Sequence, residues 1–228
     1  MTPQGVIFDL DDTLIDATSA YAEALQELGL ASKGGIYEKS RTLVKERLPR
    51  GHVCSHNRVL YFKAMLEAKG EFSGQRVLDL VRTYESALYR IVALQWDRFE
   101  RMKLMEGLRR NFVIGLLTNE TTRMQMVKIA AIDPFGVLFS AVVTSEEMGS
   151  EKPDHRNFRN VAERMGVPLE HCCVVGDSWE KDIEPALALG CSAIWTQEFT
   201  RTKYDRKDVP VVQSLNEISK WLQVRKAS

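Results

Sequence analysis

The 228-residue chain carries 31 basic and 31 acidic side chains, so its formal net charge is zero, and 44% of its residues are hydrophobic. This composition excludes an intrinsically disordered chain, which lacks enough apolar residues for a core. It also argues against a general nucleic-acid binder, which needs a basic excess. The length suits one large domain, or a core domain with a modest insertion.

Neither the apolar runs nor the cysteines indicate a membrane or secreted protein. The longest apolar runs, such as Val113–Leu117 and Phe135–Phe139, are far shorter than the about 20 residues that span a bilayer. No basic segment followed by a long apolar one opens the sequence, so no signal peptide is expected. Cys172 and Cys173 are adjacent, which suits neither a disulfide framework nor a zinc site. We therefore expect reduced thiols and a cytoplasmic protein.

The first predicted element is a short buried strand, Val6–Phe8, in which every residue is apolar. Three acids follow it directly, namely Asp9, Asp11 and Asp12. Asp12 and Thr13 are residue types that favour a turn and the start of a helix, so we expect them to serve the backbone there.

Residues 16–104 have a different pattern, with almost no strand-like runs. Apolar residues recur at helical spacing, and glycine or proline interrupts the pattern at Gly34-Gly35, Pro49–Gly51 and Phe72–Gly74. This block is predicted to be a group of helices inserted after the first strand. Its hinges are expected near 15–18 and 103–107, where Gly107 offers a permissive backbone.

From about residue 105 onward, short apolar runs alternate with amphipathic segments. Strands are predicted at Phe112–Leu117, Leu138–Val143, Cys172–Val175, Ser192–Thr196 and Val211–Val212. Helices are predicted over about 121–131, 154–165, 186–189 and 215–224. Apolar strands that alternate with helices indicate a parallel sheet covered on both faces. The predicted class is therefore α/β, with a core of residues 1–15 and 105–228 and a helical domain of residues 16–104.

Three of the predicted strands end in residues that can perform chemistry, and a lysine lies in a later loop. These residues are Asp9 and Asp11 after the first strand, Thr118 and Asn119 after the second, Asp177 and Asp182 after a later one, and Lys152. In open α/β sheets, ligands bind beyond the carboxyl ends of the strands. We therefore expect these side chains to form one site.

The chemistry of this set favours phosphoryl transfer. Carboxylates crowded at one place repel one another and resist ionisation, and a hard divalent cation relieves that repulsion. Mg²⁺ takes oxygen ligands and commonly works with phosphate. Lys152 and Thr118 can bind the remaining oxygens of a phosphoryl group. The sequence thus offers a nucleophile, an acid/base, a metal site, a cation and a hydrogen-bond donor.

The four motifs together resemble those of the haloacid dehalogenase-like hydrolase superfamily. They stand here, in the family's order, as Phe8-Asp9-Leu10-Asp11-Asp12-Thr13-Leu14, Leu117-Thr118-Asn119, Lys152-Pro153 and Gly176-Asp177-Ser178 followed by Asp182. The resemblance implies a Rossmann-like core. The inserted helices look like the family's mobile α-helical cap.

The resemblance implies a role for each motif residue in a phosphatase. Asp9 would be the nucleophile that forms an aspartyl-phosphate, and Asp11 would protonate the leaving alcohol and then activate water. Thr118, Lys152 and the backbone N–H of Asn119 would bind the phosphoryl group. Mg²⁺ would be held by Asp9, the Asp11 backbone carbonyl and Asp177, with Asp182 as a supporting or water-mediated ligand.

The cap contains a basic stretch that is open to two interpretations. Its cationic and titratable residues are Arg41, Lys45, Arg47, Arg50, His52, His56 and Arg58. A charge run of this kind is usually a solvated helix face. Alternatively, the segment from Arg50 to Arg58 faces the site, and His56 and Arg58 bind an anionic or polyhydroxylated substrate. The expected partner is a small phosphorylated molecule, with no nucleic acid and no membrane, and the expected assembly is a monomer or homodimer.

Other chemistries of the same superfamily remain as alternatives. Asp11 favours a phosphatase over a dehalogenase, because halide leaves without a proton and the family's dehalogenases generally lack this second acid. Phosphomutases tend to carry a histidine just after the first motif, and residues 17–22 contain none. A phosphonatase needs a cap lysine, and Lys33, Lys39, Lys45, Lys63 and Lys69 keep that option open. A receiver-like or non-catalytic phosphate-binding module would place an isolated Asp after a middle strand, where Thr118-Asn119 stands.

Overall fold

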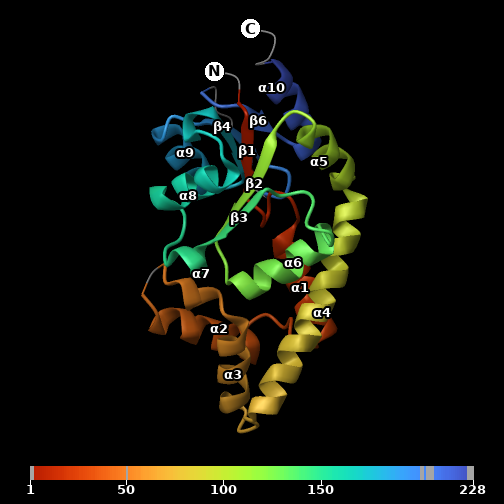
Figure 1. The fold of residues 1–228 in the computed structure, drawn as a ribbon. Coiled ribbons are helices and arrows are strands. Elements are labelled where there is room, and N and C mark those ends of the chain that lie inside the picture. Colours follow the sequence, from red (N-terminus) through yellow and green to blue (C-terminus); the bar gives the residue numbers. More distant parts are fainter. Residues whose placement is uncertain (1–2, 50, 201–202, 204–207, 225–228) are drawn as a thin grey trace.

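The computed structural model describes residues 3–49, 51–200, 203 and 208–224. Within that part of the chain, one parallel sheet has the strand order β3-β2-β1-β4-β5-β6, which places β1 in its interior (Figure 1). The strands are β1 (Gly5–Phe8), β2 (Val113–Thr118), β3 (Ala141–Thr144), β4 (Cys172–Gly176), β5 (Ser192–Thr196) and β6 (Val211–Val212). The predicted α/β class with a parallel sheet is confirmed.

Helices cover both faces of this sheet. Successive side chains of a strand point to opposite faces, and accordingly Val6 and Phe8 pack in one apolar cluster while Ile7 packs in another. The helices in the first cluster include α5 (Arg101–Arg109), α6 (Thr122–Ile132) and α10 (Ile218–Val224). Those in the second include α8 (His155–Met165) and α9 (Glu184–Ala188). The core is thus sandwiched from both sides, as the continuous apolar strands predict.

The chain between β1 and β2 is helical, as predicted. It forms α1 (Ala17–Glu27), α2 (Ile36–Arg47), a short 3₁₀ helix (Val53–His56), α3 (Arg58–Ala68), α4 (Gly74–Arg98) and α5. Figure 1 shows α2 and α3 beyond the carboxyl ends of the strands, at the end of the molecule opposite both termini, and α4 leading from there back toward α5. With 25 residues, α4 is about 38 Å long and runs along one side of the molecule.

The two connections between the inserted helices and the sheet lie side by side. Gln95, near the end of α4, accepts a hydrogen bond from the Asp16 backbone N–H and donates one to the Asp16 carbonyl, both at 3.1 Å. Further on, Glu100 adopts a left-handed φ of 52° and separates α4 from α5. The expected hinge residue Gly107 instead lies inside α5. The division at residues 15/16 and 104/105 remains a proposal.

Two predicted elements differ by three residues in where they begin, and the others differ by no more than two residues at an end. The strand predicted at Leu138–Val143 begins only at Ala141 and ends at Thr144. The cause is Asp133, whose carboxylate accepts the backbone N–H groups of Val137 and Leu138, each at 2.8 Å, and so holds a turn there. The helix predicted over 215–224 begins with a 3₁₀ turn, Leu215–Glu217, before α10. Across the described ranges, every helix is too short or too polar to cross a membrane.

Candidate active site

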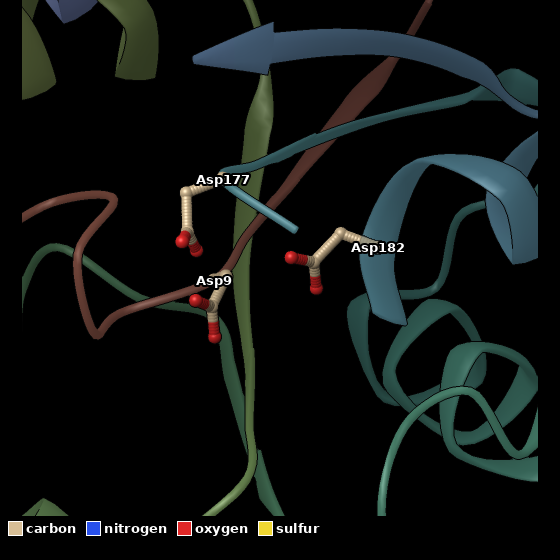
Figure 2. A group of neighbouring side chains, drawn as sticks. All are labelled: Asp9, Asp177 and Asp182. Carbon is tan, nitrogen blue, oxygen red and sulfur yellow. The ribbon is translucent and has the colours of Figure 1, made fainter. Parts of the chain in front are cut away.

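Three carboxylates converge at the carboxyl edge of the sheet. Asp9 follows β1, Asp177 follows the neighbouring strand β4, and Asp182 lies in the single π-helical turn after it, Trp179–Ile183. Figure 2 shows the three side chains directed toward a common point from three segments. Their nearest carboxylate oxygens all lie within 4.8 Å of one another. The structure therefore brings together the predicted nucleophile and two of the predicted metal ligands.

Lys152 is the cation of this cluster and is almost fully buried, at 4% exposed. Its Nζ donates to Asp9 Oδ1 at 2.6 Å, to Asp182 Oδ1 at 2.7 Å and to the Leu117 carbonyl at 3.0 Å. Asn119 fixes the lysine's backbone, because its Oδ1 accepts the Lys152 N–H at 2.7 Å and its Nδ2 donates to the Lys152 carbonyl at 3.1 Å. The Asn119 side chain therefore joins the loop after β2 to the loop that carries Lys152.

The electrostatics of the cluster leave it short of positive charge. Burial raises the pKa of Asp9 well above its usual value, and Asp182 and Asp177 raise it further, whereas Lys152 lowers it. Burial and Asp182 raise the pKa of Asp177 to about 7. One lysine is facing three carboxylates, so a divalent cation with oxygen ligands fits this donor set. Asp182 already accepts from Lys152 and, through Oδ2, from the Ser178 N–H at 3.1 Å, which suits a supporting ligand.

Asp11 occupies a separate electrostatic environment. Lys128, which is fully buried, donates from Nζ to both oxygens of the Asp11 carboxylate and, at 2.7 Å, to the Tyr21 hydroxyl. Gln125 Nε2 and the Tyr21 hydroxyl each donate to Asp11 Oδ2 at 3.2 Å. Burial acts to raise the pKa of Asp11, but Lys128 and Gln125 outweigh it and lower the pKa. The second acid of the first motif is therefore held as an anion by α6.

Hydroxyl groups from both early motifs lie among these residues. Thr118, at the end of β2, is 1% exposed, and its Oγ1 accepts from Gln125 Nε2 at 2.8 Å. Thr13 Oγ1 donates to Asp177 Oδ1 at 3.3 Å and to Asp9 Oδ2 at 3.5 Å, so Thr13 contacts the acids as well as the turn. Asp12 behaves as predicted, because its carboxylate accepts the backbone N–H of Thr18 at 2.8 Å and its hydroxyl at 2.7 Å.

The two nominated cap residues both reach the site, and each finds an acidic partner there. Arg58 is buried, donates to the His56 carbonyl at 2.7 Å and forms an ion pair with Glu120 of the loop after β2. His56 Nε2 lies 3.3 Å from Glu151 Oε1, in the loop that carries Lys152. Arg50, from the same predicted specificity segment, lies outside the described residues.

A single cavity of about 1020 Å³ joins these groups. Its floor is the sheet edge, with Asp9, Asp11, Thr118, Asn119, Lys152, Asp177 and Asp182, and its opposite wall comes from the inserted helices, with Tyr21, Arg41, Lys45, His56, Arg58 and Tyr84 among others. The motif residues from four separate segments thus line one compartment together with helical residues. Its size suits a small organic phosphate.

Sequence reasoning missed Tyr21, Glu120, Gln125 and Lys128. A signal for two of them exists, because Gln125 and Lys128 lie three residues apart in a predicted helix and so share one of its faces. Both are fully buried in the structure, and polar residues on a buried helix face need partners there. Nothing local marks Tyr21 or Glu120, whose partners lie far away along the chain.

Comparison with known proteins agrees with this geometry. Residues 3–190 match the family described as haloacid dehalogenase-like hydrolase. The chain is 32% identical over 201 residues to a ribulose-1,5-bisphosphate 5-phosphatase of Halopiger xanaduensis, covering 83% of this chain and 82% of that protein. It is 29% identical over 194 residues to a glyceraldehyde 3-phosphate phosphatase of Methanocaldococcus jannaschii, covering 82% of each. Its fold is similar to that of a 2-haloacid dehalogenase from Pseudomonas syringae, with a TM-score of 0.71 and 21% identity over 99% of this chain and 100% of the other.

Proposed function

The chain belongs to the haloacid dehalogenase-like hydrolase family, and from that premise we propose that it is a Mg²⁺-dependent phosphatase that hydrolyses a small phosphate monoester through an aspartyl-phosphate. The observation that carries the proposal is a second acid, Asp11, on the same cavity as the Asp9–Lys152 pair. An alkoxide leaving group requires a proton, whereas a halide does not. The sequence relatives are named as phosphatases, which supports the same choice.

In the first step, an Asp9 carboxylate oxygen attacks phosphorus and the bond to the ester oxygen breaks. Lys152 fixes the Asp9 carboxylate through Oδ1 and faces the phosphoryl charge. The proton for the leaving alcohol passes from Lys128 through Asp11, because Lys128 Nζ donates to both carboxylate oxygens. The pair regains this proton from the attacking water in the second step. Thr118 Oγ1, which accepts a hydrogen bond from Gln125, would donate to a phosphoryl oxygen.

In the second step, Asp11 acts as a base toward water, the form in which its lowered pKa holds it. The water oxygen bonds to phosphorus, the bond from Asp9 to phosphorus breaks, and phosphate leaves. Asp9, the Asp11 carbonyl and Asp177 would hold Mg²⁺, with Asp182 in support, and the bound ion would supply positive charge to the phosphoryl oxygens.

A substrate panel with metal control tests this proposal. Phosphate release is measured on alkyl and aryl phosphates with Mg²⁺, with excess EDTA, and after Mg²⁺ is restored. A 2-haloacid and a 2-oxoethyl phosphonate join the panel, with halide and aldehyde release as their signals. We expect Mg²⁺-dependent phosphate release from monoesters alone. Halide release, carbon–phosphorus cleavage or turnover that survives exhaustive chelation would overturn the proposal.

Substitution of the nucleophile completes the test. Asp9→Asn should lower kcat by at least about three orders of magnitude, because an amide cannot form the acyl-phosphate. Asp79→Asn is the matched control, since Asp79 is exposed on α4 and contacts only its helix neighbours Gln75, Arg82 and Thr83 in the contacts described. Activity of Asp9→Asn within tenfold of the parent would remove Asp9 from this role.

A further inference from the structure

The wall of the cavity opposite the catalytic acids is rich in positive charge. The inserted segment contributes five basic side chains to it, Lys33, Arg41, Lys45, His56 and Arg58, and one acidic side chain, Glu38. Two of these side chains are paired with neighbouring carboxylates, Arg58 with Glu120 and His56 with Glu151. His56 and Arg58, the two residues nominated from the sequence for substrate binding, therefore have partners inside the protein.

Arg41 and Lys45 are different. They lie four residues apart on α2, so they project from the same face of that helix. Neither forms an ion pair with any residue in the described part of the chain. Elsewhere in the inserted helices, Lys63 pairs with Glu67 and Arg82 with Asp79 on exposed surfaces. Two like charges four residues apart destabilise a helix when no opposite charge offsets them. Their presence on the cavity wall therefore indicates a role in binding rather than in helix stability.

The immediate surroundings strengthen the positive field at this place. Lys45 is partly buried, and burial together with Arg41 and Arg58 lowers its pKa. The nearby acids Glu120 and Glu151 are engaged by Arg58 and His56. Positive charge here is thus crowded and only partly offset, and an anion arriving in the cavity would relieve the repulsion.

Aromatic contacts join α2 and α3, the two helices behind this wall. Tyr37 of α2 packs edge-to-face on Tyr61 of α3, with ring centroids 6.1 Å apart, and on Phe62, at 5.4 Å. The Tyr61 hydroxyl in turn donates to the Ser55 carbonyl. These aromatic contacts fix α2, which carries Arg41 and Lys45, against α3.

We propose that Arg41 and Lys45 form an anion-binding subsite, and that the physiological substrate is a phosphate monoester with a second anionic group, a carboxylate or a second phosphate, at its far end. This inference rests on the proposed function, because it takes the Asp9–Lys152 end of the cavity as the place of the reacting phosphoryl group. A carboxylate and a phosphate are both anions whose oxygens accept hydrogen bonds from a guanidinium and an ammonium group.

Matched alkyl phosphates test the subsite. Chains of two, four and six carbons carry the reacting phosphate at one end and a hydroxyl, a carboxylate or a second phosphate at the other. We expect kcat/KM to be at least about tenfold higher for an anionic far end than for the hydroxyl at the best chain length. The carboxylate and phosphate series decide which anion the subsite prefers.

Variants assign that preference to the two residues. Arg41→Gln with Lys45→Gln should remove the preference by raising KM for the anionic far ends, and should lower kcat/KM much less for the hydroxyl series and for 4-nitrophenyl phosphate. Lys39→Gln, an exposed cation of the same helix that does not line the cavity, is the control and should keep the preference. Equal kcat/KM across all far ends, or an unchanged preference in the double variant, would overturn the subsite.

A binding measurement separates this proposal from the phosphatase proposal. Calorimetric titration of the same compounds into Asp9→Asn reports affinity without turnover. If the parent hydrolyses no monoester but the anionic far end still binds more tightly through Arg41 and Lys45, the phosphatase proposal fails and the subsite stands. If monoesters are hydrolysed without a far-end preference in kinetics or binding, the subsite fails and the phosphatase stands.

Discussion

At the scale of single residues, two buried lysines divide the acids of the site into groups with opposite properties. Lys152 lies among three carboxylates, and the pKa of Asp9 is raised there. Lys128 faces Asp11, with Gln125 as a further donor, and the pKa of Asp11 is lowered. When the surroundings of two nearby acids shift their pKa values in opposite directions, the two acids can take different chemical roles.

The role of Lys128 as a positioning residue can be measured through the leaving group. In Lys128→Met the single-turnover rate of ester cleavage should fall by about 100-fold for an alkyl phosphate, because Asp11 loses its proton-donating partner. The rate for 4-nitrophenyl phosphate should fall much less, because nitrophenolate leaves without a proton. Rapid-quench measurement of alcohol and nitrophenol release compares the two. An equal loss on both substrates would indicate a purely structural lysine, and circular dichroism checks that the variant is folded.

Gly176 is a second residue whose identity the site requires. A Cβ at this position would lie 2.5 Å from Cβ, Cγ and Oδ2 of Asp182, so Gly176→Ala must displace that carboxylate. We expect the Mg²⁺ concentration for half-maximal activity to rise by about tenfold or more, because residues that support metal ligands have effects of that size. Gly107→Ala is the control, since no atom lies within 4 Å of the added Cβ. An unchanged Mg²⁺ titration in Gly176→Ala would contradict the placement of Asp182.

At the scale of secondary-structure elements, the inserted helices are tied to the sheet by side chains at both ends of the cavity wall. Gln95 joins α4 to the start of α1 through the Asp16 backbone, and Arg101 Nε donates to the Leu14 carbonyl at 3.1 Å. On the cavity side, α3 is joined to the loop after β2 by the buried pair Arg58–Glu120. Movement of the helices over the site would have to break or stretch the Arg101–Leu14 and Arg58–Glu120 contacts.

The two ion pairs across the cavity should differ strongly in their effect on stability. Arg58→Met leaves Glu120 buried without its partner and should lower the free energy of unfolding by about 3–5 kcal/mol. His56→Ala breaks a more exposed pair and should cost less than about 1 kcal/mol. Urea denaturation of both variants measures the difference. Equal, small losses would show that Arg58 is free to serve the substrate, as the sequence alone suggests.

At the scale of the whole molecule, the net charge is zero, but acidic and basic side chains gather on different sides of one cavity. Carboxylates gather at the sheet edge, and unpaired cations lie on the helical wall that faces them across one cavity. A phosphorylated substrate that also carries a far-end anion would match both sides, with a metal ion at the acidic end. The insertion after β1 makes this arrangement possible, because it places helices beyond the carboxyl ends of the strands (Figure 1).

The acidic end also predicts how Mg²⁺ stabilises the molecule at different pH. Because the pKa of Asp177 in the folded, metal-free protein is raised from 3.8 to about 7, its ionisation lowers folding stability between these two pH values, and the loss is complete above about pH 7. Mg²⁺ removes that cost, and protons compete with it below pH 7. The increase in Tm on adding Mg²⁺ should therefore be larger at pH 8 than at pH 6, and Asp177→Asn should lose the difference. Equal increases at both pH values in the parent would count against this site.

The sequence by itself determined the features that depend on neighbouring residues. Apolar runs of strand length followed by acids placed Asp9, Asp11 and Asp177 at strand ends, because a parallel sheet brings its carboxyl ends to one edge. The same runs predicted helices on both faces of the sheet. Strand bounds that depend on a side-chain turn, as at Asp133, were misplaced by a few residues.

Only the tertiary structure decided which charges neutralise one another. Lys128 meets Asp11 across 117 residues of sequence, and Arg58 meets Glu120 across 62. Such pairings depend on how α6 and α3 pack against the sheet edge, and no local pattern encodes that packing. Local sequence therefore specified the reacting groups, whereas the packed fold assigned Arg58 to an internal ion pair and left Arg41 and Lys45 facing the cavity, because charge balance at a site is a property of three-dimensional neighbours.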